Sequence, residues 1–131
     1  MTKTDTSLAN FPSDEETRSL LYLCLYILQP IRDKWGLIKV NSGYRSDIVN
    51  DKVGGSRGSQ HLYGEAADIV PLDTNIDTVF EWLVNESNIP FGQAILENKN
   101  GKRWIHVSLP KLYKPSHQAL VFEGDQYKSY V

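Results

Sequence analysis

The chain of 131 residues is 40% hydrophobic and 23% charged, a composition typical of one compact globular domain. Its net charge of −2 and its scattered Lys and Arg residues exclude the basic surface that nucleic acid or an anionic membrane would require. No apolar stretch reaches the ~20 residues that span a bilayer, which argues against stable membrane insertion. We therefore expect residues 1–131 to form a single domain with a loose N-terminal arm over residues 1–11.

A long helix is predicted first. Ser13 followed three residues later by Glu16 is the pattern of a capping box, and apolar residues then recur at helical spacing. Pro30 should kink or break this helix because proline has no backbone N–H, and Gly36 suits the helix end. Cys24 lies at the same helical spacing as the apolar residues. Since it is the lone cysteine of the chain, we expect it to pack in the core as a small hydrophobe.

A short strand and a short helix follow. Residues 37–41 alternate weakly between apolar and polar, which predicts a strand that leads into a loop. Ser46 or Asp47 can cap a helix that ends near Val53. Residues 54–59 are rich in glycine and serine but lack the Gly-Lys-Ser/Thr ending of a phosphate-binding loop, so a plain loop is predicted.

The second half of the chain is predicted to form most of a sheet. Its apolar runs indicate strands over residues 66–70, 91–97, 103–109 and 119–122. Thr74 or Asn75 opens another amphipathic helix, and Asn100-Gly101 is a strong signal for a β-hairpin. The last strand is expected at the edge of the sheet. The pattern predicts an α+β fold, with helices packed on one side of a small, mainly antiparallel sheet.

His61, Asp68 and His106 form a candidate metal site. In the strand 103–109, His106 points away from the apolar face, and Asp68 lies between small and apolar residues where a carboxylate needs a cation. Two imidazoles and one carboxylate can hold one Zn²⁺ ion and leave a fourth position for water, as in catalytic zinc sites. The alternative is a loop histidine and a hydrogen-bonded sheet histidine with no metal, because such residues occur in many chains.

Glu97 is the candidate general base. If Asn100-Gly101 is a two-residue turn, Glu97 faces Trp104 across the hairpin and lies diagonal to His106, about 7–8 Å away at Cα. A Glu side chain and one water molecule can span that gap. A turn of odd length would reverse the parity and remove Glu97 from the site. A solvated Glu at a strand end is the alternative interpretation.

Arg45 lies in the loop after the first predicted strand. A fixed guanidinium can bind a substrate carboxylate or stabilise a developing oxyanion, although an isolated loop arginine often does neither. His117, the remaining histidine, follows a Lys-Pro-Ser segment and is expected at the surface.

Three motifs resemble those of the zinc D-Ala-D-Ala carboxypeptidase and L-Ala-D-Glu endopeptidase family, which includes phage endolysins and has a hedgehog-like fold. Residues 59–68 match the pattern S-x-H-x-x-G-x-A-x-D at every defined position. Residues 104–108 resemble W-[IV]-H-[VI]-S, and residues 42–46 are similar to S-G-Y-R-S. The resemblance covers about residues 20–109, and a combined motif of this length is specific.

This resemblance implies one zinc ion held by His61, Asp68 and His106. It implies that Arg45 engages the substrate and that Ser59, Gln60 and Trp104 line the peptide site. Many members carry an acidic general base three residues before the last histidine, where this chain has Arg103. A similar sub-group carries a glutamate at the end of the preceding strand instead, which corresponds to Glu97.

The expected function is zinc-dependent hydrolysis of the stem peptide of peptidoglycan, with an L-Ala-D-Glu endopeptidase favoured over a D-Ala-D-Ala carboxypeptidase. A zinc-bearing module that binds cell wall or another protein without cutting it remains the alternative, as does an interaction domain with a vestigial pocket. No signal peptide is recognised. The family resemblance therefore implies synthesis in the cytoplasm, a holin-type export partner, and action in the periplasm or cell wall. We expect a monomer.

Overall fold

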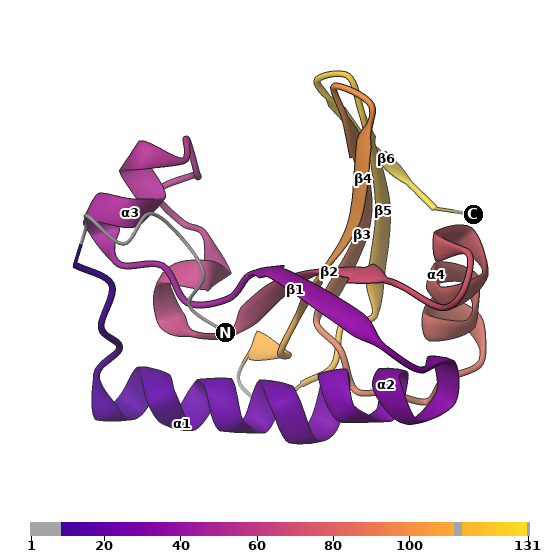
Figure 1. The fold of residues 1–131 in the computed structure, drawn as a ribbon, viewed down its shortest axis with the longest axis horizontal. Coiled ribbons are helices and arrows are strands. Elements are labelled where there is room, and N and C mark those ends of the chain that lie inside the picture. The colour runs from indigo at the N-terminus through magenta and orange to yellow at the C-terminus, as the bar shows by residue number, and fades with distance from the viewer. Residues whose placement is uncertain (1–8, 112–113, 131) are drawn as a thin grey trace.

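The computed structural model describes residues 9–111 and 114–130, so most of the predicted N-terminal arm lies outside the described residues. The helices are α1 (Asp14–Leu23), α2 (Gln29–Trp35), α3 (Asp47–Lys52) and α4 (Ile76–Asn85), with a π-helical turn over Cys24–Leu28 and a 3₁₀ turn over Gln60–Tyr63. The strands are β1 (Ile38–Ser42), β2 (Ala66–Pro71), β3 (Gln93–Lys99), β4 (Lys102–Ser108), β5 (Gln118–Glu123) and β6 (Gln126–Ser129). The chain therefore has an α+β fold, as the sequence predicted (Figure 1).

The six strands form one mixed sheet in the order β1-β2-β4-β3-β5-β6. All neighbours are antiparallel except β3 and β5, which run parallel. The hairpin between β3 and β4 turns at Asn100 and Gly101, whose φ values of 54° and 77° suit a tight two-residue turn. This turn pairs Glu97 with Trp104 and Ile95 with His106, which confirms the predicted register.

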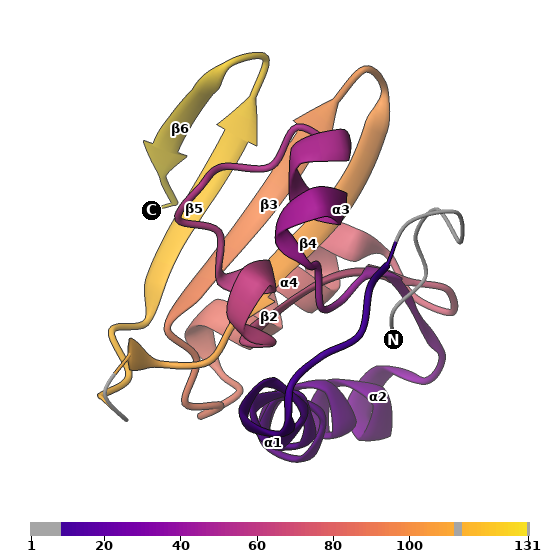
Figure 2. The same ribbon diagram turned by 90° about the vertical axis from the view of Figure 1, so that its left-hand side faces the viewer.

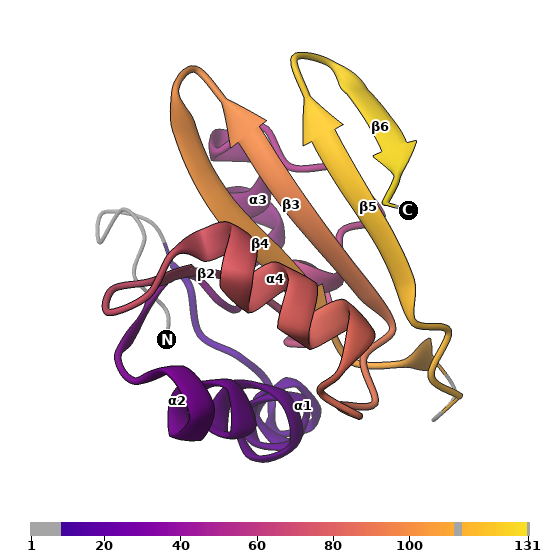
Figure 3. The same cartoon turned by 90° about the vertical axis from the view of Figure 1, so that its right-hand side faces the viewer.

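The hydrophobic core lies on one face of the sheet. On β2, β3 and β4, apolar residues at alternate positions pack there against the helices. The buried residues of this set include Ile69, Leu96 and Ile105. Helix α4 covers this face, and α1 and α2 form a layer beneath it (Figures 1 and 3). Cys24 is partly buried against the same core, as predicted.

Helix α3 lies on the opposite face of the sheet, which corrects the prediction that all helices pack on one side (Figure 2). This helix buries Val49 and Asn50, and Asn50 takes part in a polar contact network. The side chain of Asn50 is buried in α3, accepts a hydrogen bond from Arg45 at 3.3 Å and donates one to the carbonyl of Ser56 at 2.8 Å. Ser46 caps α3, as the sequence predicted.

The first helix begins as predicted but does not break at Pro30. Ser13 and Glu16 form the full capping box, with the Glu16 N–H donating to the Ser13 hydroxyl at 3.2 Å. Near Pro30 the chain widens into the π-helical turn Cys24–Leu28 and continues as α2 (Figure 1). A π turn relieves the clash between a proline ring and the preceding turn, so the helix persists. It ends at Gly36, whose φ is 85°.

The C-terminal strands also differ from the prediction. The expected edge strand is β5, but it lies inside the sheet, parallel to β3, and β6 forms the edge. A parallel neighbour is hard to predict because its partner is distant in sequence. The consequence is that the sheet face carrying His106 extends across β5 and β6.

Candidate metal centre

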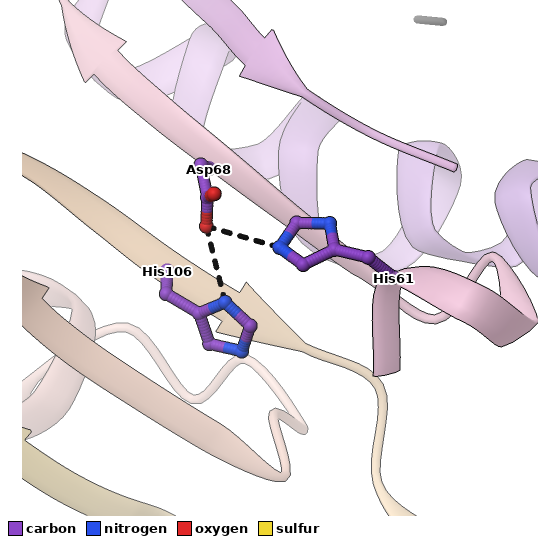
Figure 4. Close-up of side chains that lie close together, drawn as sticks. All are labelled: His61, Asp68 and His106. Carbon is purple, nitrogen blue, oxygen red and sulfur yellow. Dashed lines mark hydrogen bonds and ion pairs between the residues drawn. The ribbon is translucent and has the colours of Figure 1, made fainter. Parts of the chain in front are cut away.

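The ligand atoms of His61, Asp68 and His106 lie within 4.8 Å of one another (Figure 4). Asp68 on β2 and His106 on β4 are directly opposite in the sheet, and His61 reaches them from the 3₁₀ turn. One carboxylate oxygen, Oδ1 of Asp68, faces His61 Nε2 at 3.2 Å and His106 Nδ1 at 3.1 Å. The three residues singled out in the sequence thus converge at one point.

The imidazole of His61 is held by the backbone of the preceding loop. Its Nδ1 lies 2.8 Å from the carbonyl oxygen of Gly43, and the N–H of Arg45 donates to the His61 carbonyl at 2.9 Å. With the Nδ1 proton donated to Gly43, the lone pair of Nε2 faces Asp68. This outer hydrogen bond fixes the tautomer that a metal requires.

The motif around His61 also has structural reasons for its other positions. The Ser59 hydroxyl accepts from the His61 N–H at 3.2 Å and caps the 3₁₀ turn. Gly64 ends this turn with a φ of 70°, and a Cβ there would come within 2.5 Å of the Glu16 carbonyl oxygen. Only glycine meets both conditions. Ala66 is fully buried at the start of β2, two residues before Asp68.

Asp68 is held ionised despite its burial. Desolvation by burial opposes ionisation, but the imidazoles of His106 and His61, when they are protonated, donate hydrogen bonds and bring positive charge that together outweigh it and lower the pKa of the Asp68 carboxyl well below its usual range. Oδ2 accepts a further hydrogen bond from Arg45 Nη2 at 3.2 Å. The carboxylate is therefore available as an anionic ligand.

Arg45 contacts Asp68 in addition to facing the groove. Its Nε donates to the Ser42 hydroxyl at 2.9 Å, and its two terminal nitrogens donate to Asn50 and Asp68. Three of the five N–H groups of a guanidinium are used in this way, and the side chain still lines the groove beside the metal ligands. Engagement of the substrate by Arg45 stays a prediction.

Glu97 lies in the same groove, on the sheet face of His106. Its Oε2 accepts a hydrogen bond from Trp104 Nε1 at 2.6 Å, which fixes the carboxylate. Burial raises the pKa of Glu97, and the negative charge of Asp68 adds to this effect. Arg103 points to the other face, where it forms a bidentate ion pair with Asp77 of α4 at 2.6 and 3.1 Å.

The groove has a volume of about 680 Å³ and passes over the three candidate ligands. Ser59, Gln60 and Trp104, predicted to line a peptide site, all border it, and their contact with a substrate stays a prediction. Residues 54–59 form a loop without helix or strand, as predicted, and this loop forms one wall of the groove. His117 lies outside this site and is exposed, as expected.

The donor set fits zinc. Zn²⁺ prefers imidazole nitrogen and carboxylate oxygen, and a site with three protein ligands leaves a position for water or substrate. Both ring nitrogens of His61 face oxygen acceptors, so a neutral imidazole can satisfy only one of them. A cation between His61 Nε2 and Asp68 Oδ1 satisfies the other.

Three ligands, a neighbouring carboxylate and an open groove are the arrangement of hydrolases that use one metal ion. The model of the family described as Peptidase M15 matches residues 4–108, and the chain belongs to that family. It is 41% identical over 54 residues to a zinc D-Ala-D-Ala carboxypeptidase of Streptomyces albus G. This match covers 40% of the chain but only 21% of that protein, so the chain spans about a fifth of the length of this curated relative.

Several residues that shape the site were missed in the sequence. The Gly43 carbonyl orients His61, and Ser42 and Asn50 hold Arg45. Phe122 and Tyr127 border the groove because β5 lies beside β3. The alternation of polar and apolar residues predicts on which face of the sheet Phe122 lies once the strand next to β5 is known. It does not predict which strand is that neighbour.

Proposed function

We propose that this protein is a zinc-dependent peptidase that hydrolyses the stem peptide of peptidoglycan, with the L-Ala-D-Glu bond as its target. The observation that carries the proposal is the convergence of His61, Asp68 and His106 in the groove that the partly buried carboxylate of Glu97 also lines. Membership of the peptidase M15 family supports peptide hydrolysis. We assign the activity to one domain of hedgehog-like architecture; the apolar cluster that joins helices and sheet in the described residues supports a single domain.

The residues of the chain suit the chemistry. Zinc held by His61, Asp68 and His106 would supply Lewis-acid activation of water and of the scissile carbonyl. Glu97 would take the proton of the attacking water and return it to the leaving amine. Its raised pKa makes it a better proton acceptor than an exposed glutamate, and the indole of Trp104 holds it in place. Arg45 would donate its remaining N–H groups to the substrate carbonyl.

The groove supports an endopeptidase. It continues on both sides of the ligands, from Val53 and Phe122 at one end to Lys111 and Ser116 at the other, so a chain can lie across the site. A D-Ala-D-Ala carboxypeptidase is the second candidate, favoured by the activity for which the Streptomyces relative is named. Mass spectrometry of muropeptides digested by the zinc-loaded protein separates the two, because the new termini identify the bond.

The role of Glu97 is tested by Glu97→Gln, which keeps the size of the side chain and removes the base. We expect the zinc content to stay at one ion per chain and the rate of murein cleavage to fall by roughly 10²–10⁴-fold. Glu81→Gln, an exposed position on α4 on the other side of the sheet, is the matched control and should cleave normally. Normal cleavage by the Glu97 variant would show that the base has been assigned wrongly.

The proposal also predicts that the protein cleaves cell wall and does not merely bind it. Purified sacculi incubated with the zinc-loaded wild type should release new amino groups. If the wild type sediments with sacculi but, like the Glu97→Gln variant, releases no amino groups, the protein is a binding module instead.

A further inference from the structure

The outer part of the groove is built by strands that the family match does not include. That match ends at residue 108, whereas β5 and β6 follow it. Because β5 lies parallel to β3 and β6 pairs with β5, the two strands extend the sheet on the side of Glu97 (Figures 1 and 2). Their side chains can therefore give this chain a binding property of its own.

Three aromatic residues flank Glu97 in one row across four strands. Trp104 pairs with Glu97, Glu97 pairs with Phe122, and Phe122 pairs with Tyr127. All four side chains border the groove. The rings of Phe122 and Tyr127 lie 4.5 Å apart at an interplanar angle of 48°, and Tyr127 is 57% exposed. We call Trp104, Phe122 and Tyr127 the aromatic row.

The two ends of the groove differ chemically. The end away from the aromatic row carries amides and lysines, with Gln93 Nε2 donating to Gln118 Oε1 at 3.0 Å and Lys111 and Lys114 nearby in the lining. Amides and cations suit a peptide with carboxylates. The aromatic row instead offers flat apolar faces, and Lys99 lines the groove two residues further along β3. A sugar ring has apolar C–H faces that pack on aromatic faces and a rim of hydroxyl groups that hydrogen-bond to polar neighbours.

The spacing matches the chemistry of peptidoglycan. On β3, Glu97 pairs with Trp104 of the aromatic row and Ile95 pairs with His106. The aromatic row therefore lies two residues along the strand from His106. Two strand residues span about 7 Å. In peptidoglycan, the muramic acid sugar is joined through its lactyl group to L-Ala, the first residue of the stem. A cut after L-Ala therefore leaves the sugar about this far from the scissile bond.

We propose that Phe122 and Tyr127 form a subsite for the pyranose ring of the glycan strand, next to the peptide site. This inference rests on the proposed function, whose substrate it specifies further: the enzyme acts on stem peptide that still carries its sugar. The subsite binds the sugar by stacking, and it places L-Ala and the bond after it over the metal ligands.

The test compares cleavage of a disaccharide-bearing muropeptide with cleavage of the same peptide, N-acetylated and free of sugar. Tyr127→Ala should raise KM for the muropeptide about tenfold and leave the sugar-free peptide unaffected. Tyr127→Phe, which keeps the ring, should stay within about twofold of the wild type. Tyr26→Ala is the matched control, because Tyr26 is 56% exposed on the first helix and does not border the groove.

A binding measurement gives a second readout that needs no catalysis. The disaccharide of N-acetylglucosamine and N-acetylmuramic acid, without peptide, should perturb the NMR signals of the Phe122 ring and the Trp104 indole in the wild type, and these perturbations should be absent in Tyr127→Ala. Equal losses on both substrates would show that the aromatic row contacts peptide, and disaccharide binding that survives Tyr127→Ala would remove the subsite. If the wild type cleaves neither substrate, the proposed function fails, and the titration still decides the subsite.

Discussion

At the scale of single residues, the site depends on side chains that hold other side chains in place. Gly43 orients His61, Arg45 binds Asp68, and Trp104 holds Glu97. In each case a hydrogen bond holds one atom of the side chain, and another, potentially reactive atom of the same side chain faces the groove. A loose ligand or base would lose most of its effect, because an error of 1 Å in position can cost a large factor in rate.

Trp104→Phe separates positioning from substrate contact. The variant keeps an aromatic ring but loses the N–H that donates to Glu97 at 2.6 Å. A hydrogen bond to a charged group contributes ~1.5–3 kcal/mol, so we expect kcat to fall by about tenfold or more with KM unchanged. Steady-state kinetics on the muropeptide measure both constants. A rise in KM at constant kcat would instead make Trp104 a substrate contact.

Arg103 provides a test of strand parity. The family resemblance implies an acidic base at that position, yet here Arg103 faces α4 and pairs with Asp77. We therefore expect Arg103→Glu not to restore cleavage to the Glu97→Gln variant, because the new carboxylate lies on the wrong face of the sheet.

Arg103→Ala is the control for loss of the exposed ion pair. It should retain most of the activity and cost less than about 1 kcal/mol of unfolding free energy, which is the usual range for surface pairs. Murein cleavage is measured as released amino groups. If the double variant Glu97→Gln/Arg103→Glu recovers this activity, the register assigned to β4 is wrong.

At the scale of elements, the turns and caps decide where the functional side chains point. The Asn100-Gly101 turn sets the β3–β4 register, and the register places Glu97 beside the metal ligands. The first helix supports the motif around His61, because Gly64 lies against the backbone of α1 at Glu16. The elements near the N-terminus therefore contribute to the geometry of the site.

The capping box of α1 has a measurable effect. Ser13→Ala removes the hydroxyl that accepts from the Glu16 N–H, and we expect the free energy of unfolding to fall by about 1 kcal/mol. Urea unfolding followed by circular dichroism measures this change. Ser13→Asp retains a capping oxygen and should match the wild type within a few tenths of a kcal/mol. Equal losses in both variants would mean that the cap does not stabilise the helix.

At the scale of the whole molecule, the metal centre joins elements far apart in the chain. His61, Asp68 and His106 come from a turn and two strands, so an ion bound to all three stabilises the folded state over the unfolded one. The described part of the chain contains no helix that is long and apolar enough to cross a membrane. The groove and the core occupy opposite faces of the same sheet.

Removal of zinc should lower the thermal stability. At free zinc a thousandfold above its Kd, binding contributes about 4 kcal/mol, so a chelator should lower Tm by roughly 10 °C or more. His61→Ala should abolish the dependence of Tm on zinc, whereas His117→Ala, at the exposed histidine outside the cluster, should keep it. A zinc-dependent rise in Tm that persists in His61→Ala would place the ion elsewhere.

Several features of this protein are encoded by residues that are neighbours in the sequence. The capping box at Ser13, the cap at Ser46, the Asn100-Gly101 hairpin and the shared face of Glu97 and His106 all follow from local spacing and turn chemistry. These features suffice to predict an α+β fold and the candidate ligands.

The contacts between distant segments, in contrast, become visible only in the folded chain. The π-helical turn before Pro30, the place of α3 across the sheet, the bond of Arg45 to Asp68 and the insertion of β5 beside β3 were not predicted. Each depends on which segments meet, and no local pattern specifies a parallel neighbour or a partner many residues away. The aromatic row follows from the same cause, since Phe122 and Tyr127 reach the groove only because β5 lies against β3.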